Sequence, residues 1–333
     1  TVSAVGGRNM ILLALAGGTL LFFFTDGRYA IMLATWCAFR LATSQVWGGF
    51  TYIVANWVDG ADVGKTMGIL AVAWELGTGG AEAIFGWMLG DRGVEHWREP
   101  FYVTGFVNIA VFVVIFLFLH GTAVSAGYRM PLLKTETGGP HPLQHLRVQP
   151  TLAVFASTAR FWLILVSNSC ILAALYTLYF VNVYAVKALG ATDQEGALIL
   201  TYISIGTVTA IILATFTYDA MSKMMRAVLL TCSNLGFISL SYTTCVLVAS
   251  GKMTVPLLTG LGAAAAFCGG FGAYLPISLF QIQFGGPRHA STMSNLHDTM
   301  GIALSALASY LAGGYVENGQ YIHYWGLFTA NVA

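Results

Sequence analysis

Charged residues are scarce in this sequence. Only 9% of its 333 residues are Asp, Glu, Lys or Arg, and 57% are hydrophobic, whereas soluble domains carry about 25% charged residues. One globule cannot bury so many apolar side chains, so lipid must serve as the solvent. The net charge of +1 gives no basic footprint for nucleic acid. The composition predicts an all-α, multi-pass integral membrane protein surrounded by lipid.

Paired cysteines and catalytic motifs are missing as well. The five cysteines lie in apolar tracts without CxxC spacing, which indicates small core residues rather than disulfides or zinc ligands. They are Cys37, Cys170, Cys232, Cys245 and Cys268. No GxSxG nucleophile elbow and no HExxH pair occurs in the sequence. We therefore expect no metal and no cofactor, and we rank an intramembrane enzyme third among the classes of function.

Apolar tracts of about 20 residues, the length that a helix needs to cross a bilayer, are what the sequence has instead. Charges, Gly or Pro separate ten of them. They span residues 10–25, 29–58, 65–90, 100–119, 160–186, 196–217, 226–249, 254–284, 290–314 and 321 to the end. The last tract is short and the first residue is Thr1, so we expect a fragment that lacks two earlier spans.

A polar stretch at residues 120–158 separates four of these spans from six. It predicts an N-terminal bundle at 1–119, a linker at 120–158 and a C-terminal bundle at 159–333. If the linker is cytoplasmic, nine Lys and Arg residues lie inside, five lie outside, and Arg40 lies within a span. Because basic residues accumulate on the cytoplasmic side, this bias favours a cytoplasmic linker.

Two short patterns recur in the predicted bundles. Trp47–Phe50 in the second span resembles Cys268–Phe271 in the eighth, and Lys65–Leu70 in the third resembles Ser291–Leu296 in the ninth. Such repeats are typical of secondary transporters, whose site lies between the two halves.

With these features the sequence resembles the major facilitator superfamily, and within it the organophosphate/phosphate antiporter family. The similarity rests on Arg40-Leu-Ala-Thr-Ser44, on Trp97-Arg-Glu-Pro-Phe101 and on the degraded loop motif Thr217–Arg226. The resemblance implies two bundles of six helices, of which helices three to twelve are present here. It also places the first, fourth, seventh and tenth spans outside the transport cavity. We expect the protein to be a monomer.

Ionisable residues within spans are candidates for function, because each costs about 2.5 to 3.5 kcal/mol near the bilayer centre. Four qualify, namely Arg40, Glu75, Glu82 and Asp298, and His297 adjoins the last. For Glu75 we weigh a buried acid paired with an unseen base against a carboxyl that exchanges a proton or binds a cationic group. For Glu82 we favour a structural ion pair with Arg40. For His297 a structural role is the commoner alternative, whereas Asp298 favours function.

Small residues share a helix face with the two glutamates. Gly68, Gly79 and Gly86 fall on one stripe with Glu75 and Glu82. The stripe either lines a cavity or touches a neighbouring helix closely. For the glycines of the run Gly77-Thr78-Gly79-Gly80 we favour tight packing of helices.

Polar side chains within the fifth and eighth spans complete the set of candidates. Asn168, Tyr176 and Tyr179 lie on the fifth span. On the eighth, Tyr274 precedes Pro276, and Gln281 and Gln283 follow. The tyrosines are as typical of packing as of substrate contact, whereas a mid-span amide must find a partner.

The sequence departs from the antiporter family where phosphate would bind. The resemblance places Leu175 at the position of a phosphate-binding arginine, and Glu75 at the position of a histidine. Both changes oppose binding of a doubly charged phosphate ester. We therefore predict a secondary active transporter of a small organic solute, coupled to protons through Glu75, with Asp298 as second candidate. An organic anion or phosphate-ester antiporter and a transport-dead sensor are the alternatives.

Overall fold

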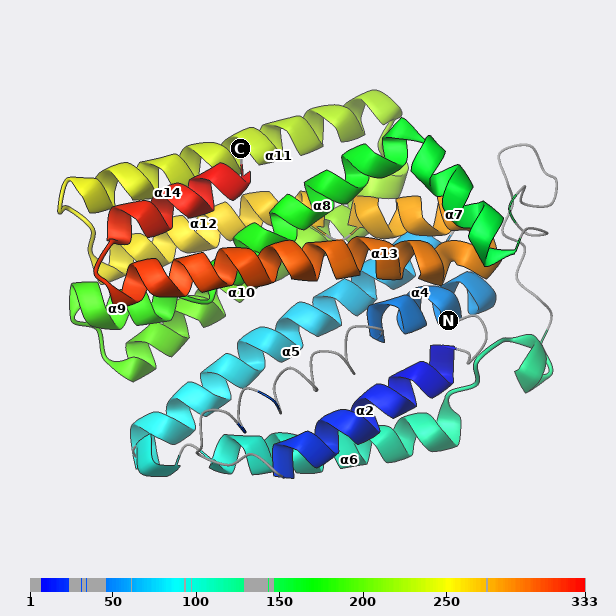
Figure 1. Cartoon of the computed structure of the whole chain (residues 1–333), viewed down its shortest axis with the longest axis horizontal. Coiled ribbons are helices and arrows are strands. Elements are labelled where there is room, and N and C mark those ends of the chain that lie inside the picture. Colours follow the sequence, from blue (N-terminus) through cyan, green and yellow to red (C-terminus); the bar gives the residue numbers. More distant parts are fainter. Residues whose placement is uncertain are drawn as a thin grey trace. The chain divides into compact units, whose positions relative to one another are not determined.

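A computed structural model of the chain describes residues 7–23, 31, 34, 46–60, 62–92, 94–96, 98–128, 143, 147–273 and 275–332. These residues form helices joined by short turns, and no strand occurs among them (Figure 1). The α-helices are α2 (Gly7–Phe23), α4 (Val46–Trp57), α5 (Val63–Arg92), α6 (Glu99–Phe118), α7 (Val148–Ser157), α8 (Ala159–Leu178), α9 (Val181–Leu189), α10 (Asp193–Thr217), α11 (Lys223–Ala249), α12 (Val255–Ala273), α13 (Leu275–Glu317) and α14 (Tyr321–Val332). Three short 3₁₀ helices lie at Val94–His96, Val124–Ala126 and Tyr218–Ala220.

Six segments of the described chain are long and apolar enough to cross a membrane. They are Glu99–Phe118, Ala159–Leu189, Asp193–Thr217, Lys223–Ala249, Val255–Gly286 and Arg288–Glu317. In the part of the chain that the structure describes, the other four predicted tracts do not meet both criteria. Helices α2, α4 and α14 have 17, 12 and 12 residues, and α5 has 30 residues but is less apolar because of its glycines and two glutamates. Part of the second tract, including Arg40, lies outside the described residues.

One of the predicted spans is interrupted within the described residues. The expected helix at 160–186 ends at Leu178, and α9 begins at Val181. The N–H of Phe180 bonds to the carbonyl of Thr177, three residues back, and the Asn182 side chain accepts the N–H of Val183 at 2.7 Å, so these groups leave the α-helical ladder. The described residues of the expected helix at 254–284 belong to α12 and to the start of α13, which together form the candidate span Val255–Gly286, and Tyr274 lies outside the described residues.

Within α13 the chain folds back on itself. Gly286 has φ 64° and ψ −179°, which is not helical. Gln281 and His297 are 16 residues apart, about 24 Å along one continuous helix, yet their side-chain nitrogens lie 3.3 Å apart. Two antiparallel segments therefore meet at Gly286, and they correspond to the predicted eighth and ninth spans.

By its contacts the chain divides into two compact units. The first comprises Thr1–Thr66, Arg92–Thr158 and Ser278–Thr299, and the second comprises Met67–Asp91, Ala159–Ile277 and Met300–Ala333. Each unit contains segments from both sides of the linker. The division into bundles at 1–119 and 159–333 stays a prediction.

The first unit contains α2, α4 and α6, with α2 packed against both of the others (Figure 1). Ile11 and Ala14 of α2 are buried. The Arg8 guanidinium donates a 2.6 Å hydrogen bond to the carbonyl of Phe116, which joins the start of α2 to the end of α6. Only 6% of the α6 span is buried, so its apolar side chains suit contact with lipid, as we expected for the fourth span.

The second unit is built around α10, α11 and α12, which pack side by side (Figure 1). Glycine permits their close approach: a Cβ at Gly270 of α12 would lie 2.9 Å from that of Ala210 on α10. Helix α14 packs on α8 and α11 and buries Tyr324, Trp325 and Phe328 completely or nearly so. These aromatic rings form much of the apolar core.

Candidate transport site

The glycine stripe of α5 packs against α10 in the second unit. A Cβ at Gly79 would lie 2.7 Å from the Cβ of Ser204, and one at Gly68 would lie 2.7 Å from Cγ2 of Thr215. Gly86 makes a similar close approach to Ala197. Close contact with a neighbouring helix is thus confirmed for Gly68, Gly79 and Gly86. For Gly77 and Gly80 the packing prediction is wrong, because a Cβ at either position would have nothing within 4 Å.

Glu75 and Glu82 lie on the same helix, two turns apart, and both are partly buried. Glu82 falls between Gly79 and Gly86 along the seam with α10, and its Oε2 atom has no hydrogen-bond partner among the described residues. Because Arg40 lies outside those residues, the ion pair between Arg40 and Glu82 stays a prediction. Placing two carboxyl groups in one predicted membrane span costs free energy, and the close packing of the glycines does not explain why both are present.

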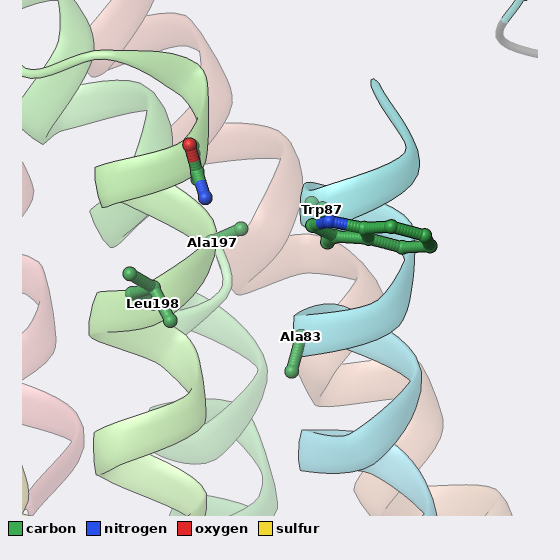
Figure 2. Close-up of a pocket in the computed structure, with 6 residues that line it drawn as sticks. Ala83, Trp87, Ala197 and Leu198 are labelled. Carbon is green, nitrogen blue, oxygen red and sulfur yellow. The ribbon is translucent and has the colours of Figure 1, made fainter. Parts of the chain in front are cut away.

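A small pocket lies beside the same seam. Figure 2 shows the lining residues Ala83 and Trp87 on α5 and Ala197 and Leu198 on the neighbouring α10. Gly86 and Gln194 complete its lining. None of these six residues is ionisable. The pocket could therefore contact a solute, but it contains no group that could couple transport to protons.

The candidates on the fifth span occupy different environments. Asn168 on α8 is buried, with 3% of its surface exposed. Tyr176 and Tyr179 meet edge to face, with ring centroids 5.6 Å apart, but Tyr179 lies in the break after α8 and is exposed. This arrangement favours Asn168 and Tyr176 over Tyr179 as groups that could contact a solute.

His297 belongs to a buried cluster in the first unit. Gln281, on the first segment of α13, places its amide nitrogen 3.3 Å from Nδ1 of His297, and both side chains are almost fully buried. The amide can donate to this nitrogen, which fits a neutral imidazole with its proton on Nε2. The Phe280 ring stacks on the imidazole at 6.3 Å. The segment of α13 before Gly286 therefore holds the histidine ring in place.

Asp298 is tied to a second helix through a serine. The Ser294 hydroxyl donates to Oδ2 of Asp298 at 3.2 Å, and the Thr51 hydroxyl of α4 lies 3.5 Å from the Ser294 oxygen. Both hydroxyl residues are fully buried. Next to them Gly48 leaves room for Asn295, whose Cγ would lie 2.7 Å from a Cβ at position 48. The carboxyl thus sits at the end of a polar contact between α4 and α13.

The contributions of Thr51 and Ser294 to this cluster are not part of the sequence prediction, whereas Gln281 is one of the amides that the sequence places on the eighth span. Ser294 precedes Asp298 by one helical turn, so helix geometry alone could have paired them. Thr51 is 243 residues away from Ser294 in sequence, and periodicity does not indicate which helices meet. Among the described residues no group of three or more His, Cys, Asp or Glu could hold a metal ion.

The long apolar helices indicate a multi-pass membrane protein. The family model described as Major Facilitator Superfamily matches residues 3–313. The chain belongs to this superfamily, whose members are transporters, and the predicted helical membrane fold is confirmed. The organophosphate antiporter subfamily stays a prediction.

Solved structures share the fold. The human organic anion transporter MFSD10 matches with a TM-score of 0.67 at 16% identity, covering 100% of this chain and 78% of that one. The proton:xylose symporter XylE matches with a TM-score of 0.66 at 14% identity, covering 99% and 80%. A variant of the E. coli fucose:proton symporter FucP matches with a TM-score of 0.61 at 13% identity, covering 99% and 82%. No curated protein matches the sequence.

Proposed function

We propose that the chain is a secondary active transporter that moves a small organic solute by alternating access and couples this movement to protons. The observation that carries the proposal is a pair of carboxyl groups, Glu75 on α5 and Asp298 on α13, within predicted membrane spans of a Major Facilitator Superfamily chain. A carboxyl in such surroundings is costly unless it serves binding or proton exchange. The fold is shared with two proton symporters, XylE and FucP, which supports coupling to protons.

The polar groups near Asp298 suit an organic solute with hydroxyl groups. Gln281, His297 and Ser294 offer amide, imidazole and hydroxyl contacts, all of which can donate or accept hydrogen bonds. Leu175 and Glu75 stand where the antiporter resemblance expects phosphate-binding residues. An organic anion is therefore the second candidate as substrate, supported by the fold shared with MFSD10 and opposed by these two positions.

Transport by purified protein in liposomes tests the proposal. An inward proton gradient should drive accumulation of L-fucose, D-xylose or another small neutral solute from a labelled panel. Glu75→Gln or Asp298→Asn should abolish the proton-driven accumulation but leave downhill exchange, because neutral side chains of the same shape keep the pathway and lose the proton. Gln283→Asn, at an exposed amide on α13, provides a matched control.

Three other outcomes identify the alternatives. Full proton-driven accumulation by both neutralised variants would refute the assignment of the coupling groups. Competition by inorganic phosphate and sugar phosphates, without uptake of neutral solutes, would identify an anion antiporter. Thermal stabilisation by a solute without any flux would identify a transport-dead sensor.

A further inference from the structure

Oxygen atoms outnumber hydrogen-bond donors where α4 approaches α13 in the first unit. The Thr51 hydroxyl has a single proton and two neighbouring acceptors, the Trp47 carbonyl at 2.9 Å and the Ser294 oxygen at 3.5 Å. The shorter of these contacts is the better hydrogen bond. Ser294 gives its own proton to Asp298. No proton is then left between the two hydroxyl oxygens, which face each other with lone pairs only.

Asn295 adds a further oxygen to the same place. Its Oδ1 atom is buried and has no hydrogen-bond partner among the described residues. The atom lies in the space that a Cβ at Gly48 would occupy. Gly48 precedes Thr51 by three residues, so both lie on one face of α4. A buried acceptor without a donor calls for a water molecule or an ion.

Asp298 brings a negative charge to these oxygens. It forms no ion pair with the residues that the structure describes, and a carboxylate in a predicted span is costly without a positive partner. Thr51 and Ser294 are fully buried, whereas Asn295 and Asp298 keep part of their surface exposed. A cation could therefore enter past the exposed residues and be bound by the buried ones.

The spacing of the oxygens fits a cation of the size of Na⁺. Neighbouring oxygen ligands held about 2.4 Å from an ion, the distance typical of Ca²⁺, lie about 3.4 Å apart. Ser294 Oγ lies 3.2 Å from Asp298 Oδ2 and 3.5 Å from Thr51 Oγ. Na⁺ is almost as large as Ca²⁺ but carries one charge, which a single carboxylate balances. A divalent ion would keep an uncompensated charge in apolar surroundings.

We propose that Thr51, Ser294, Asn295 and Asp298 form a Na⁺ site, in which one carboxylate and three neutral oxygens replace part of the hydration shell of the ion. Na⁺ and a proton then compete for the Asp298 carboxylate. The use of bound Na⁺ as a coupling ion rests on the proposed function, whereas the binding itself does not.

Equilibrium binding of radioactive Na⁺ to the purified chain in detergent tests the site. Asp298→Asn should abolish binding, because the amide keeps the shape and loses the charge. Ser294→Ala and Thr51→Val remove one ligand each and should weaken binding several-fold. Unlabelled Na⁺ should displace the label, whereas an equal concentration of choline should not. Lowering the pH should weaken binding, because protons compete for the carboxylate.

Thr299→Val provides the matched control. Thr299 follows Asp298 directly, is exposed and donates to the carbonyl of Asn295 in its own helix, so loss of its hydroxyl should leave Na⁺ binding unchanged. Thermal unfolding in choline chloride shows whether each variant is folded. Added Na⁺ should raise the unfolding midpoint of the parent and of Thr299→Val, but not that of Asp298→Asn. If Asp298→Asn fails to fold, the weaker binding by Ser294→Ala and Thr51→Val carries the test.

Absence of Na⁺ binding by the parent would overturn the site and leave water as the donor to these oxygens. Undiminished binding by Asp298→Asn, Ser294→Ala and Thr51→Val alike would also overturn it, as would an equal loss in Thr299→Val. The binding assay needs neither a solute nor a gradient, so its result is independent of the liposome uptake assay. Proton-driven uptake without Na⁺ binding would refute only the site. Na⁺ binding without any uptake would refute the proposed function and leave the site established.

Discussion

Gly79 of α5 faces Ser204 of α10 so closely that a Cβ at position 79 would lie 2.7 Å from the serine Cβ. The next turn of α10 adds Thr201, whose hydroxyl points at the Gly79 carbonyl at 3.5 Å. The absence of a side chain at position 79 therefore sets the distance between these two helices. On the same helix, a Cβ at Gly77 would have nothing within 4 Å of it.

This difference predicts opposite effects of one substitution at two neighbouring glycines. Gly79→Ala should destabilise the protein by about 1–3 kcal/mol, because the methyl group overpacks the seam. Gly77→Ala should be neutral or stabilising by up to about 1 kcal/mol, because alanine favours the helix and meets nothing. Thermal unfolding in detergent measures both, and equal midpoints for the two variants would contradict the close packing of α5 on α10.

A buried tyrosine ties α14 to α8. The Tyr324 hydroxyl donates a 2.9 Å hydrogen bond to the carbonyl of Thr177, and the tyrosine side chain is fully buried. Tyr324→Phe should lower the free energy of unfolding by about 1 kcal/mol, because the ring stays packed and one hydrogen bond is lost. Tyr310→Phe, at a side chain that is 80% exposed, should leave thermal unfolding unchanged, and a loss of the same size there would argue against this bond.

The predicted polar linker contains a docked helix. In α7 the Phe155 ring lies 5.5 Å from that of Phe284, and the Thr151 hydroxyl lies 3.3 Å from Nε2 of His289. Thr151 and Phe155 are both buried. Apolar residues at a helical period explain why this part of the linker folds, although the stretch as a whole is polar.

Phe155→Ala should therefore destabilise the protein by about 3–5 kcal/mol, because a large buried ring leaves a cavity. Val154→Ala, at an exposed position on the same helix, provides the comparison and should change stability little. Limited proteolysis in the linker measures the docking directly: cleavage should be faster in Phe155→Ala than in Val154→Ala. Equal cleavage rates would indicate that α7 is not held by this ring.

The start of α10 carries a capping box. The Thr192 hydroxyl accepts the N–H of Glu195 at 3.2 Å, and the Glu195 carboxylate accepts the N–H of Thr192 at 2.8 Å. Thr192→Ala should weaken this helix end by about 1 kcal/mol, whereas Thr192→Ser keeps the oxygen and should retain most of the stability. Hydrogen exchange at the first-turn amides checks the prediction, which fails if the alanine and serine variants exchange alike.

Most of the helices were predictable because an apolar tract of about 20 residues has few solutions in lipid other than a helix. The break after Leu178 was not, since neither Pro nor Gly occurs at residues 178–181 and the Asn182 side-chain bond has no marker in the sequence. The glycine stripe of α5 revealed a close contact but not its partner. Likewise, the sequence identifies Asp298 as a carboxyl group within a predicted span. Its link to Thr51 was not predictable, because it depends on which helices meet.

Gly286 decides whether the longest helical stretch is one rod or two. Its backbone angles, φ 64° and ψ −179°, fall in a region that is essentially reserved for glycine. Any other residue here would favour a straighter chain and carry Gln281 away from His297. The contact between the Gln281 amide and the His297 imidazole in the first unit thus depends on the absence of a Cβ atom at Gly286, five residues after Gln281.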